Sequence, residues 1–317
     1  MRTRRRHSSS DSVSPHDTSH IPVLLHETIE LLAIKKNDVV LDATLGGGGH
    51  AQEILKRLGT HGVLIGIDAD GSILKRTQQK LHKNVEGKTA YFAEGNFRTL
   101  ASLLETLKIR SIDEVLFDLG WNTLQLTSGR GFSFQSNDPL VMTFASLLRG
   151  DAVIASRVVN EWSEETLQSI FTGFGEERYA RRISRMIVNR REQKPFETAR
   201  ELADAIFRAV PPAYRYGKIH PATRTFQALR IAVNDELGAI QEGFEAAWKA
   251  LSKNGRIAFI TFHSVEDRLV KHLMRDKVYQ GTGRLLTRHP LTPSPEEAAS
   301  NPRSRSAKLR VIEKQVA

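Results

Sequence analysis

Short hydrophobic runs alternate with longer amphipathic stretches from residue 20 onward. The apolar runs cover residues 39–43, 63–68, 89–93 and 115–118, and the stretches between them carry apolar residues at the spacing of a helix. Short runs that end in glycine or polar residues are typical of buried strands. Strands that alternate with helices predict an α/β fold with a doubly wound parallel sheet, in which all strand C-termini share one ligand-binding edge.

This rhythm stops between residues 130 and 216, where the pattern shows helices punctuated by prolines and no strand. We therefore expect an inserted all-helical domain. After Pro221, apolar residues at three- and four-residue steps predict one long helix that ends near Gly255, followed by strands at 256–262 and 307–313. The expected organisation is a sheet domain in two parts, residues 20–130 and 217–317, around a helical domain at 131–216.

The first 19 residues differ from the rest, because they are rich in Arg and Ser and have Val13 as their only branched apolar residue. Such a segment cannot bury enough surface to offset its ordering entropy, so we expect a disordered arm. It also lacks the apolar core of a secretory signal.

Composition narrows the function. No apolar run is long enough for a transmembrane helix, and the absence of cysteine excludes disulfides, cysteine-bound metals and thiolate nucleophiles. The net charge of +10 indicates a polyanionic partner such as nucleic acid. No metal-ligand spacing is evident among the histidines, so we expect no required metal.

The turn after the first strand carries the first chemical signal. Gly46-x-Gly48-x-x-Ala51 fits a nucleotide-binding fingerprint, and Asp68 ends the second strand 22 positions after Gly46, close to the spacing of about 20 for a ribose-binding carboxylate. Asp70 is better suited to cap the following helix. The cofactor is then a dinucleotide or S-adenosylmethionine. The second is favoured because the turn offers only His50 to a pyrophosphate, and because Asp118 ends the fourth strand beside the cofactor.

A set of motifs extends these signals along the chain. They are residues 20–25 (HIPVLL), 42–50 (DATLGGGGH), 118–120 (DLG), 130–134 (RGFSF), 175–178 (GEER), 220–234 (HPATRTFQALRIAVN), 262–268 (FHSVEDR) and 301–306 (NPRSRS). In this order they resemble the RsmH/MraW family, the bacterial small-subunit rRNA cytosine-N4 methyltransferases.

The resemblance implies a class I (Rossmann-like) methyltransferase sheet with a helical insertion after the fourth strand. It implies S-adenosylmethionine as the methyl donor and a cytidine in the decoding region of 16S rRNA as the acceptor. The cofactor-binding residues carried over by motif are Gly48, Gly49, His50, Asp68, Phe97, Asp118 and Gln125.

Two segments depart from the family pattern. The usual Val-Ser-Ser after Asp-Leu-Gly is replaced by Trp121-Asn122-Thr123, and the usual Asp-Met-Arg-Met is replaced by Val141-Met142-Thr143-Phe144. Both segments are expected beside the acceptor pocket. The departures therefore bear on target choice and turnover more than on cofactor binding.

The amine of cytosine is a poor nucleophile. The rate of methyl transfer should therefore depend mainly on the alignment of donor and acceptor and on the removal of water. We predict Asp118, Asn122 and His263 as catalytic residues, with Asp118 orienting the amine or the methionyl group and His263 forming a wall of the acceptor site. Methylation at C5 commonly uses a cysteine adduct, so the lack of cysteine favours a nitrogen or oxygen acceptor.

Arginines cluster in and beside the insertion and should contact RNA phosphates. The candidates are Arg178, Arg181, Arg182, Arg224, Arg303 and Arg305. The acceptor base must be unstacked into its pocket, where Trp121, Phe132 or Phe134 could stack on it.

Two other functions remain open. One is a catalytically weakened protein that binds the cofactor and RNA during ribosome assembly, motivated by the two altered segments. The other is a nicotinamide dehydrogenase, motivated by the glycine–aspartate pair alone. For the methyltransferase, the expected partner is rRNA or the 30S subunit in the cytoplasm, with no membrane association; a homodimer is one option for the oligomeric state.

Overall fold

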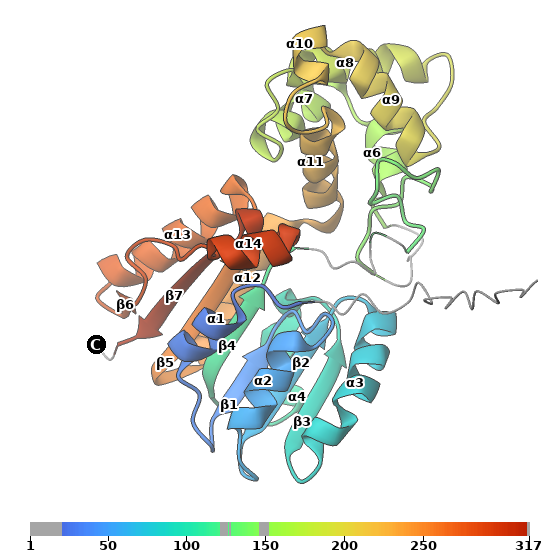
Figure 1. The fold of residues 1–317 in the computed structure, drawn as a ribbon. Coiled ribbons are helices and arrows are strands. Elements are labelled where there is room, and N and C mark those ends of the chain that lie inside the picture. The colour runs from blue at the N-terminus through green and yellow to red at the C-terminus, as the bar shows by residue number, and fades with distance from the viewer. Residues whose placement is uncertain (1–20, 121–125, 127, 146–151, 316–317) are drawn as a thin grey trace, which may run out of the picture.

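A computed structural model describes residues 21–120, 126, 128–145 and 152–315. It has a sheet covered by helices on both faces and a separate helical layer beyond one edge of that sheet (Figure 1). The expected disordered arm lies outside the described residues.

Seven strands of the described chain form one sheet in the order β3-β2-β1-β4-β5-β7-β6. Strands β1 to β5 are parallel, and β7 runs antiparallel to both β5 and β6. The predicted doubly wound α/β sheet is therefore confirmed, with an antiparallel edge. The strands are β1 (Val39–Asp42), β2 (Val63–Asp68), β3 (Thr89–Glu94), β4 (Ile112–Asp118), β5 (Leu251–Thr261), β6 (Gly283–Leu285) and β7 (Lys308–Lys314).

Successive strand residues face opposite sides of the sheet, so each strand contributes side chains to two hydrophobic cores. Val40 and Leu64 pack under the helices on one face, whereas Leu41 and Ile65 pack under those on the other face. The first face carries α1 (Leu25–Leu32), α2 (Gly49–Arg57) and α3 (Gly71–Val85). The second carries α4 (Leu100–Thr106), α12 (Glu236–Ala250) and α13 (Ser264–Tyr279). The connecting segments hold η1 (Phe97–Thr99), α14 (Pro295–Ser300) and η2 (Pro302–Ser306).

The helical layer has its own hydrophobic core, in which Phe171, Ile183 and Phe196 are fully buried. Its helices are α6 (Ala155–Glu161), α7 (Glu164–Gly173), α8 (Ala180–Arg191), α9 (Ala199–Ala209), α10 (Pro212–Arg215) and the first part of α11 (Ala222–Asn234). Helix α11 runs from this layer back to the sheet (Figure 1). The helical core therefore continues past residue 216 into α11.

The prediction of one long helix after Pro221 was wrong. Asp235 adopts a left-handed backbone with φ of 45° and separates α11 from α12. Arg98 holds this break, because its guanidinium donates to the Asp235 carbonyl and pairs with its carboxylate at 2.6 Å. Strand β5 also begins earlier than expected, at Leu251, and contains Gly255.

Candidate active site

A cavity, here called the edge cavity, opens at the carboxyl edge of the parallel strands. The turns after β1, β2, β3 and β4 line it together with the start of α12. This is where a doubly wound sheet is expected to bind a ligand.

Asp68 is fixed at the floor of this cavity by two backbone donors. The Gly46 N–H donates to Oδ2 at 2.8 Å and the Asp70 N–H donates to Oδ1 at 2.9 Å. Burial raises the pKa of Asp68 to about 6, although the two N–H groups partly oppose that rise. Asp70 caps α3 through Ser72 and Ile73, as the sequence indicated.

The glycines of the turn have different surroundings. Gly46, Gly47 and Gly49 line the edge cavity, whereas Gly48 is turned toward α3. Gly48 has a left-handed backbone, and a Cβ there would lie 2.6 Å from Thr77. A Cβ on Gly49 would collide with Pro22. Close packing of the turn against its neighbours therefore accounts for both glycines, and Gly48 lies behind the cavity wall.

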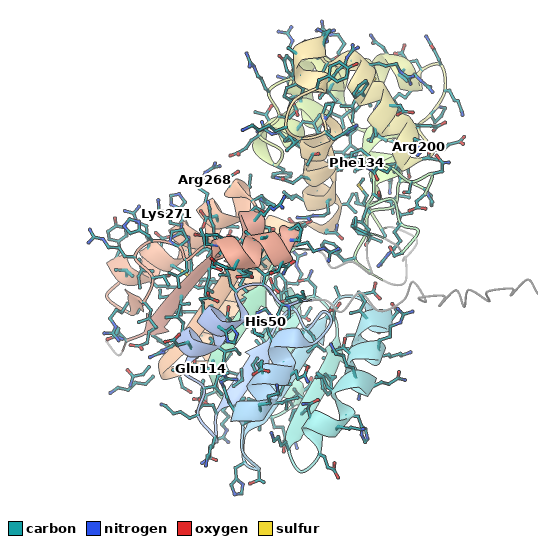
Figure 2. The ribbon with its side chains drawn as sticks, in the orientation of Figure 1. His50, Glu114, Phe134, Arg200, Arg268 and Lys271 are labelled. Atoms are coloured by element: carbon teal, nitrogen blue, oxygen red, sulfur yellow. The ribbon has the colours of Figure 1, made fainter. Side chains whose placement is uncertain are left out.

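His50 and Asp118 face each other across the cavity. The His50 Nε2–H donates to the Val23 carbonyl at 3.1 Å, and Nδ1 lies 3.6 Å from Asp118 Oδ2. Figure 2 places His50 between α1 and α2, at the edge of the sheet. With Nε2 donating to Val23, Nδ1 is the ring nitrogen that faces the Asp118 carboxyl group.

Asp118 is the most unusual carboxyl group of the cavity. Its Oδ1 is buried without a hydrogen-bond partner in the described part of the chain. Burial, followed by the nearby charges of Asp42 and Glu266, raises its pKa well above the usual value. A buried acceptor without a donor is costly, so this oxygen is suited to receive a donor from a ligand.

An apolar slot occupies the other end of the cavity. Phe97 lines it and packs edge-on against Phe117, with ring centroids 5.4 Å apart. Ile240 and Ala239 of α12 complete its wall. This slot offers flat apolar surface to an aromatic ring. Gln125 and Asn122, like Trp121 and Thr123, lie outside the described residues.

A second cavity, here called the aromatic cavity, adjoins the first. Phe132, Phe134, Phe226 and Phe262 line it, and Figure 2 shows Phe134 beside α11. Three residues line both cavities: Gly120, Phe262 and Arg303. The two cavities therefore meet at this point.

His263 lines the aromatic cavity and also caps α13. Its Nδ1 accepts from the Glu266 N–H at 3.3 Å, and its Nε2 lies 3.0 Å from Glu266 Oε1. Both ring nitrogens thus have partners in the protein. The geometry supports a wall residue held in one orientation rather than a proton carrier.

A buried charge cluster lies beneath both cavities. Arg230 of α11 pairs with Glu236 at 2.7 Å and lies 3.7 Å from Glu266. Burial alone would raise the pKa of Glu266, but His263 and Arg230 outweigh it and hold that pKa below the usual value. Glu236, His263 and Glu266 have the spacing of metal ligands. Because Arg230 already supplies a positive charge here, our prediction remains that no metal is required.

Sequence reasoning did not assign a role to Glu236, Glu266, Arg230 or Asn234. Arg230, Asn234 and Glu266 stand in motifs that carried the resemblance, which was the available signal. No sequence signal indicated Glu236, because only the break at Asp235 brings this residue to the edge cavity.

The predicted RNA-binding arginines fall into two groups. Arg178, Arg181 and Arg182 are exposed with Arg185 around a hollow at the start of α8, and Arg178 stacks over Tyr179. Arg303 and Arg305 lie on η2, where Arg303 borders both cavities and Arg305 donates to the Ala298 carbonyl. Arg224 donates to the Glu176 carbonyl at 2.7 Å.

The residues present fit S-adenosylmethionine. Asp68 offers carboxylate oxygens to ribose hydroxyls, the Phe97 slot suits the adenine, and Asp118 with Glu266 suits a cationic methionyl group. Among the described residues, Arg303 is the only Lys or Arg lining the edge cavity. A pyrophosphate would therefore find fewer partners than a sulfonium.

Comparisons with known proteins identify the relatives of this chain. Residues 17–315 match the profile of the MraW methylase family. The chain is 44% identical to "Ribosomal RNA small subunit methyltransferase H" of Sulfurihydrogenibium sp. over 292 residues, covering 92% of this chain and 98% of that protein. It is 45% identical to the protein of the same name from Nostoc sp., covering 94% of this chain and 93% of that protein.

Proposed function

This chain belongs to the MraW methylase family, and from that premise we propose that it methylates the exocyclic N4 of a cytidine in the decoding region of small-subunit rRNA. It is an S-adenosylmethionine-dependent rRNA methyltransferase. The observation that carries the proposal is the contact between the edge cavity and the aromatic cavity at Gly120, Phe262 and Arg303. A donor in the first and a base in the second would meet there.

The edge cavity holds the donor. S-adenosylmethionine supplies a methyl group on a positively charged sulfur. Asp68 would accept hydrogen bonds from the ribose, and the surface formed by Phe97 and Ile240 would cover the adenine. His50 and Gly49 border the methionyl end together with Asp118. The pKa of Glu266 is held below its usual value, so its carboxylate supplies a negative charge that favours a cation there, because opposite charges attract strongly away from water.

The aromatic cavity takes the acceptor base. A cytosine flipped out of its stack needs apolar surface and a way to hold its amine hydrogens. Phe132, Phe134 and Phe262 supply the surface. The unpartnered Oδ1 of Asp118 supplies an acceptor near the junction, so that Asp118 orients the amine for in-line transfer. Asn122, proposed for the same task, lies outside the described residues.

Arginines on α8 and η2 would hold the RNA. Arg178, Arg181 and Arg182 can contact phosphates away from the two cavities, while Arg303 lines their junction. Arg305 on η2 and Arg224 on α11 would add further phosphate contacts. Phosphate contacts of this kind position RNA without reading its sequence. The substrate is rRNA or the 30S subunit, encountered in the cytoplasm where subunits are assembled. Within the described residues, no helix has the length and apolar character needed to cross a membrane.

Labelled methyl transfer to small subunits from cells lacking this gene tests the proposal. Nucleoside mass mapping should then find N4-methylcytidine in the decoding region. Asp118→Ala should lower kcat/KM by about 100-fold or more, as expected when a group aligned with the reacting atoms is lost. A methyl group on C5, or an unchanged rate for Asp118→Ala, would contradict the proposal.

A catalytically weakened assembly protein remains the second candidate, because two segments depart from the family pattern. Of these, the described one has Val141 and Thr143 where Asp and Arg are usual. Tight binding of S-adenosylmethionine and of small subunits, without methyl transfer, would favour this candidate. Family membership leaves no support for the nicotinamide dehydrogenase.

A further inference from the structure

Two stacked aromatic side chains, here called the wall, each line a different one of the two cavities. Phe144 lines the edge cavity, and Phe132 lines the aromatic cavity. Their rings stack with centroids 5.6 Å apart and planes inclined by 11°. Because each ring forms part of a different cavity, a displacement of one ring changes the shape of both.

Arg130 fixes this wall from behind. Its Nη1 donates to the carbonyls of Phe144 and Ala145 at 3.0 and 3.2 Å, and its guanidinium lies 5.7 Å from the Phe132 ring centroid. The Arg130 carbonyl accepts from the N–H of Met142 at 2.8 Å. Arg130 therefore contacts both aromatic residues of the wall and fixes their relative positions.

The backbone of the wall is in an uncommon conformation. Met142 is buried with φ of 56°, in the left-handed region that side chains rarely adopt. Asn234 at the end of α11 holds this segment from the other side, donating to the Met142 carbonyl and accepting from the Phe144 N–H, both at 2.8 Å. Such a conformation persists only where surrounding contacts determine it.

The other end of Arg130 reaches the cofactor side of the sheet. Its Nη2 pairs with Asp70 Oδ2 at 2.5 Å, and the Asp70 side chain is 3% exposed. Burial would raise the pKa of Asp70, but Ser72 and Arg130 outweigh it and lower that pKa. The Asp70 N–H in turn donates to Asp68, the carboxylate assigned to the ribose. One chain of contacts thus joins Asp68 to the wall.

Neither Arg130 nor Asp70 is among the described residues that line the two cavities. Any effect of this pair on a ligand must therefore pass through Asp68 or the wall. We propose that Arg130 is a positioning residue that couples occupancy of the edge cavity to the shape of the aromatic cavity, so that cofactor and acceptor RNA bind cooperatively. This rests on the proposed function, because it takes the two ligands from there.

The test measures a coupling factor and needs no turnover. The dissociation constant of S-adenosylhomocysteine is measured by calorimetry with and without saturating rRNA-containing small subunits. Wild-type protein should bind it about 10-fold more tightly with the subunit, within the roughly 5- to 150-fold range usual for coupled sites. By reciprocity, the cofactor product should strengthen subunit binding by the same factor.

Arg130→Met should reduce the factor to about 2 or less, while the affinity for S-adenosylhomocysteine alone changes by less than about 3-fold, since the removed side chain touches neither ligand. Arg130→Lys keeps the charge, but a single ammonium cannot span both Asp70 and the carbonyls, so most of the coupling should also be lost. Asp70→Asn keeps the helix cap and should lower the factor even if Arg130→Met fails to fold.

Arg256→Met is the matched control. Arg256 also joins a carboxylate and a carbonyl, those of Glu313 and Leu31, but at the antiparallel side of the sheet. It should leave the coupling factor at its wild-type value. A wild-type factor near 1, or a wild-type factor in both Arg130→Met and Asp70→Asn, would overturn the inference. A wild-type protein that binds neither ligand would instead overturn the proposed function.

Discussion

At the scale of single residues, the carboxyl groups of the edge cavity differ because their donors differ. Asp68 has two N–H donors, Glu266 has a histidine and an arginine nearby, and one oxygen of Asp118 has no partner in the described structure. Carboxyl groups at one sheet edge therefore have different pKa values, raised for Asp68 and Asp118 and lowered for Glu266. The sequence predicts that Asp68 and Asp118 lie at the carboxyl ends of strands. It does not predict which groups donate hydrogen bonds to them.

Cofactor affinity should depend on pH through Asp68. Its pKa is raised to about 6 in the protein without ligand, and ribose hydroxyls bind best to the ionised form. Below pH 6 the affinity for S-adenosylhomocysteine should therefore fall, approaching about 10-fold for each pH unit. Calorimetry between about pH 5 and 8 checks this. Asp68→Asn should bind weakly with a much flatter pH profile; an unchanged profile would assign the dependence to another group.

Glu114 should make the protein less stable as the pH rises. Burial is the main cause that raises its pKa to about 9, from 4.5 in an exposed chain. Between these values the folded state binds one more proton than the unfolded state, so stability decreases with increasing pH through this window. Glu114→Gln should raise Tm by about 2–4 °C at pH 8 and by less at pH 5. Thermal unfolding at both pH values measures this, and an equal effect at both would contradict it.

The sequence indicated several single positions correctly for local reasons. Asp70 was expected as a helix cap because it follows a strand and precedes a polar helix, and this was confirmed. Gly48 could not be separated from Gly49 by its pattern, since only the approach of α3 turns Gly48 away from the cavity. The Asp70 N–H that donates to Asp68 and the Glu266 N–H that donates to His263 are local in sequence, whereas the second donor to Asp68, the Gly46 N–H, is 22 positions away.

At the scale of elements, α12 supports the apolar slot of the edge cavity. Gly243 lies against Phe97, and a Cβ there would be 2.6 Å from the ring. Gly243→Ala should displace Phe97, destabilise the fold by about 1–3 kcal/mol and weaken cofactor binding by about 10-fold. Gly173→Ala in α7 is the control, because no atom lies within 4 Å of the position that its methyl group would take. Calorimetry and chemical unfolding of both variants make the comparison.

Helix α8 should contribute affinity for RNA and nothing to the chemical step. Arg181 and Arg182 are exposed beside the hollow at its start. Arg181→Glu with Arg182→Glu should raise KM for small subunits by about 10-fold or more, leave kcat unchanged and reduce the salt dependence of binding by about two phosphate contacts.

The control for that pair has the same charge change elsewhere. Lys75→Glu with Lys83→Glu alters two exposed residues of α3, a helix that packs on the sheet and has no residue in the helical core. It should change KM by less than about 2-fold, because long-range attraction between exposed charges is screened by salt. An equal loss in both variants would reveal an effect of net charge alone.

Element boundaries were less predictable than element types. The periodicity of residues 221–250 correctly predicted helix. The break at Asp235 does not interrupt the periodicity, because α11 and α12 each bury an apolar face. The break is held by Arg98, which is 137 positions away in sequence. A partner at that distance leaves no local signal.

At the scale of the whole molecule, the buried cluster around Arg230 joins the helical layer to the sheet. Arg230 belongs to α11, and its partners Glu236 and Glu266 belong to α12 and α13. Arg230→Met would leave two carboxylates buried without their cation. It should lower the free energy of unfolding by about 3–5 kcal/mol, and Glu236→Gln in the same chain should recover part of that loss.

Urea unfolding followed by circular dichroism measures these changes. The helical core and the sheet cores are separate, so Arg230→Met should also broaden or split the transition. An unchanged midpoint and a single sharp transition would show that the cluster contributes little to joining the two parts.

A parallel doubly wound sheet and a helical insertion were predicted from the alternation of patterns. The strand order, the antiparallel edge and the contacts between sheet and insertion were not. Phe144 and Phe132 were separate positions in the sequence, and their stacking into one wall results from the left-handed turn at Met142. Phe132 packs against the helical core and Phe144 lines the edge cavity, so their stacking depends on the fold of the segment that joins them.

Helix α11 begins in one core and ends among the residues that shape the other. Its apolar face packs with the helical core as far as Val233, whereas Arg230 and Asn234 on the same helix contact the charge cluster and the wall. Recombination that transplants a recognition module between relatives should therefore place the crossover before Arg230. A chimera joined after Asn234 would import foreign groups into the catalytic half, even though its junction would fall neatly between two helices.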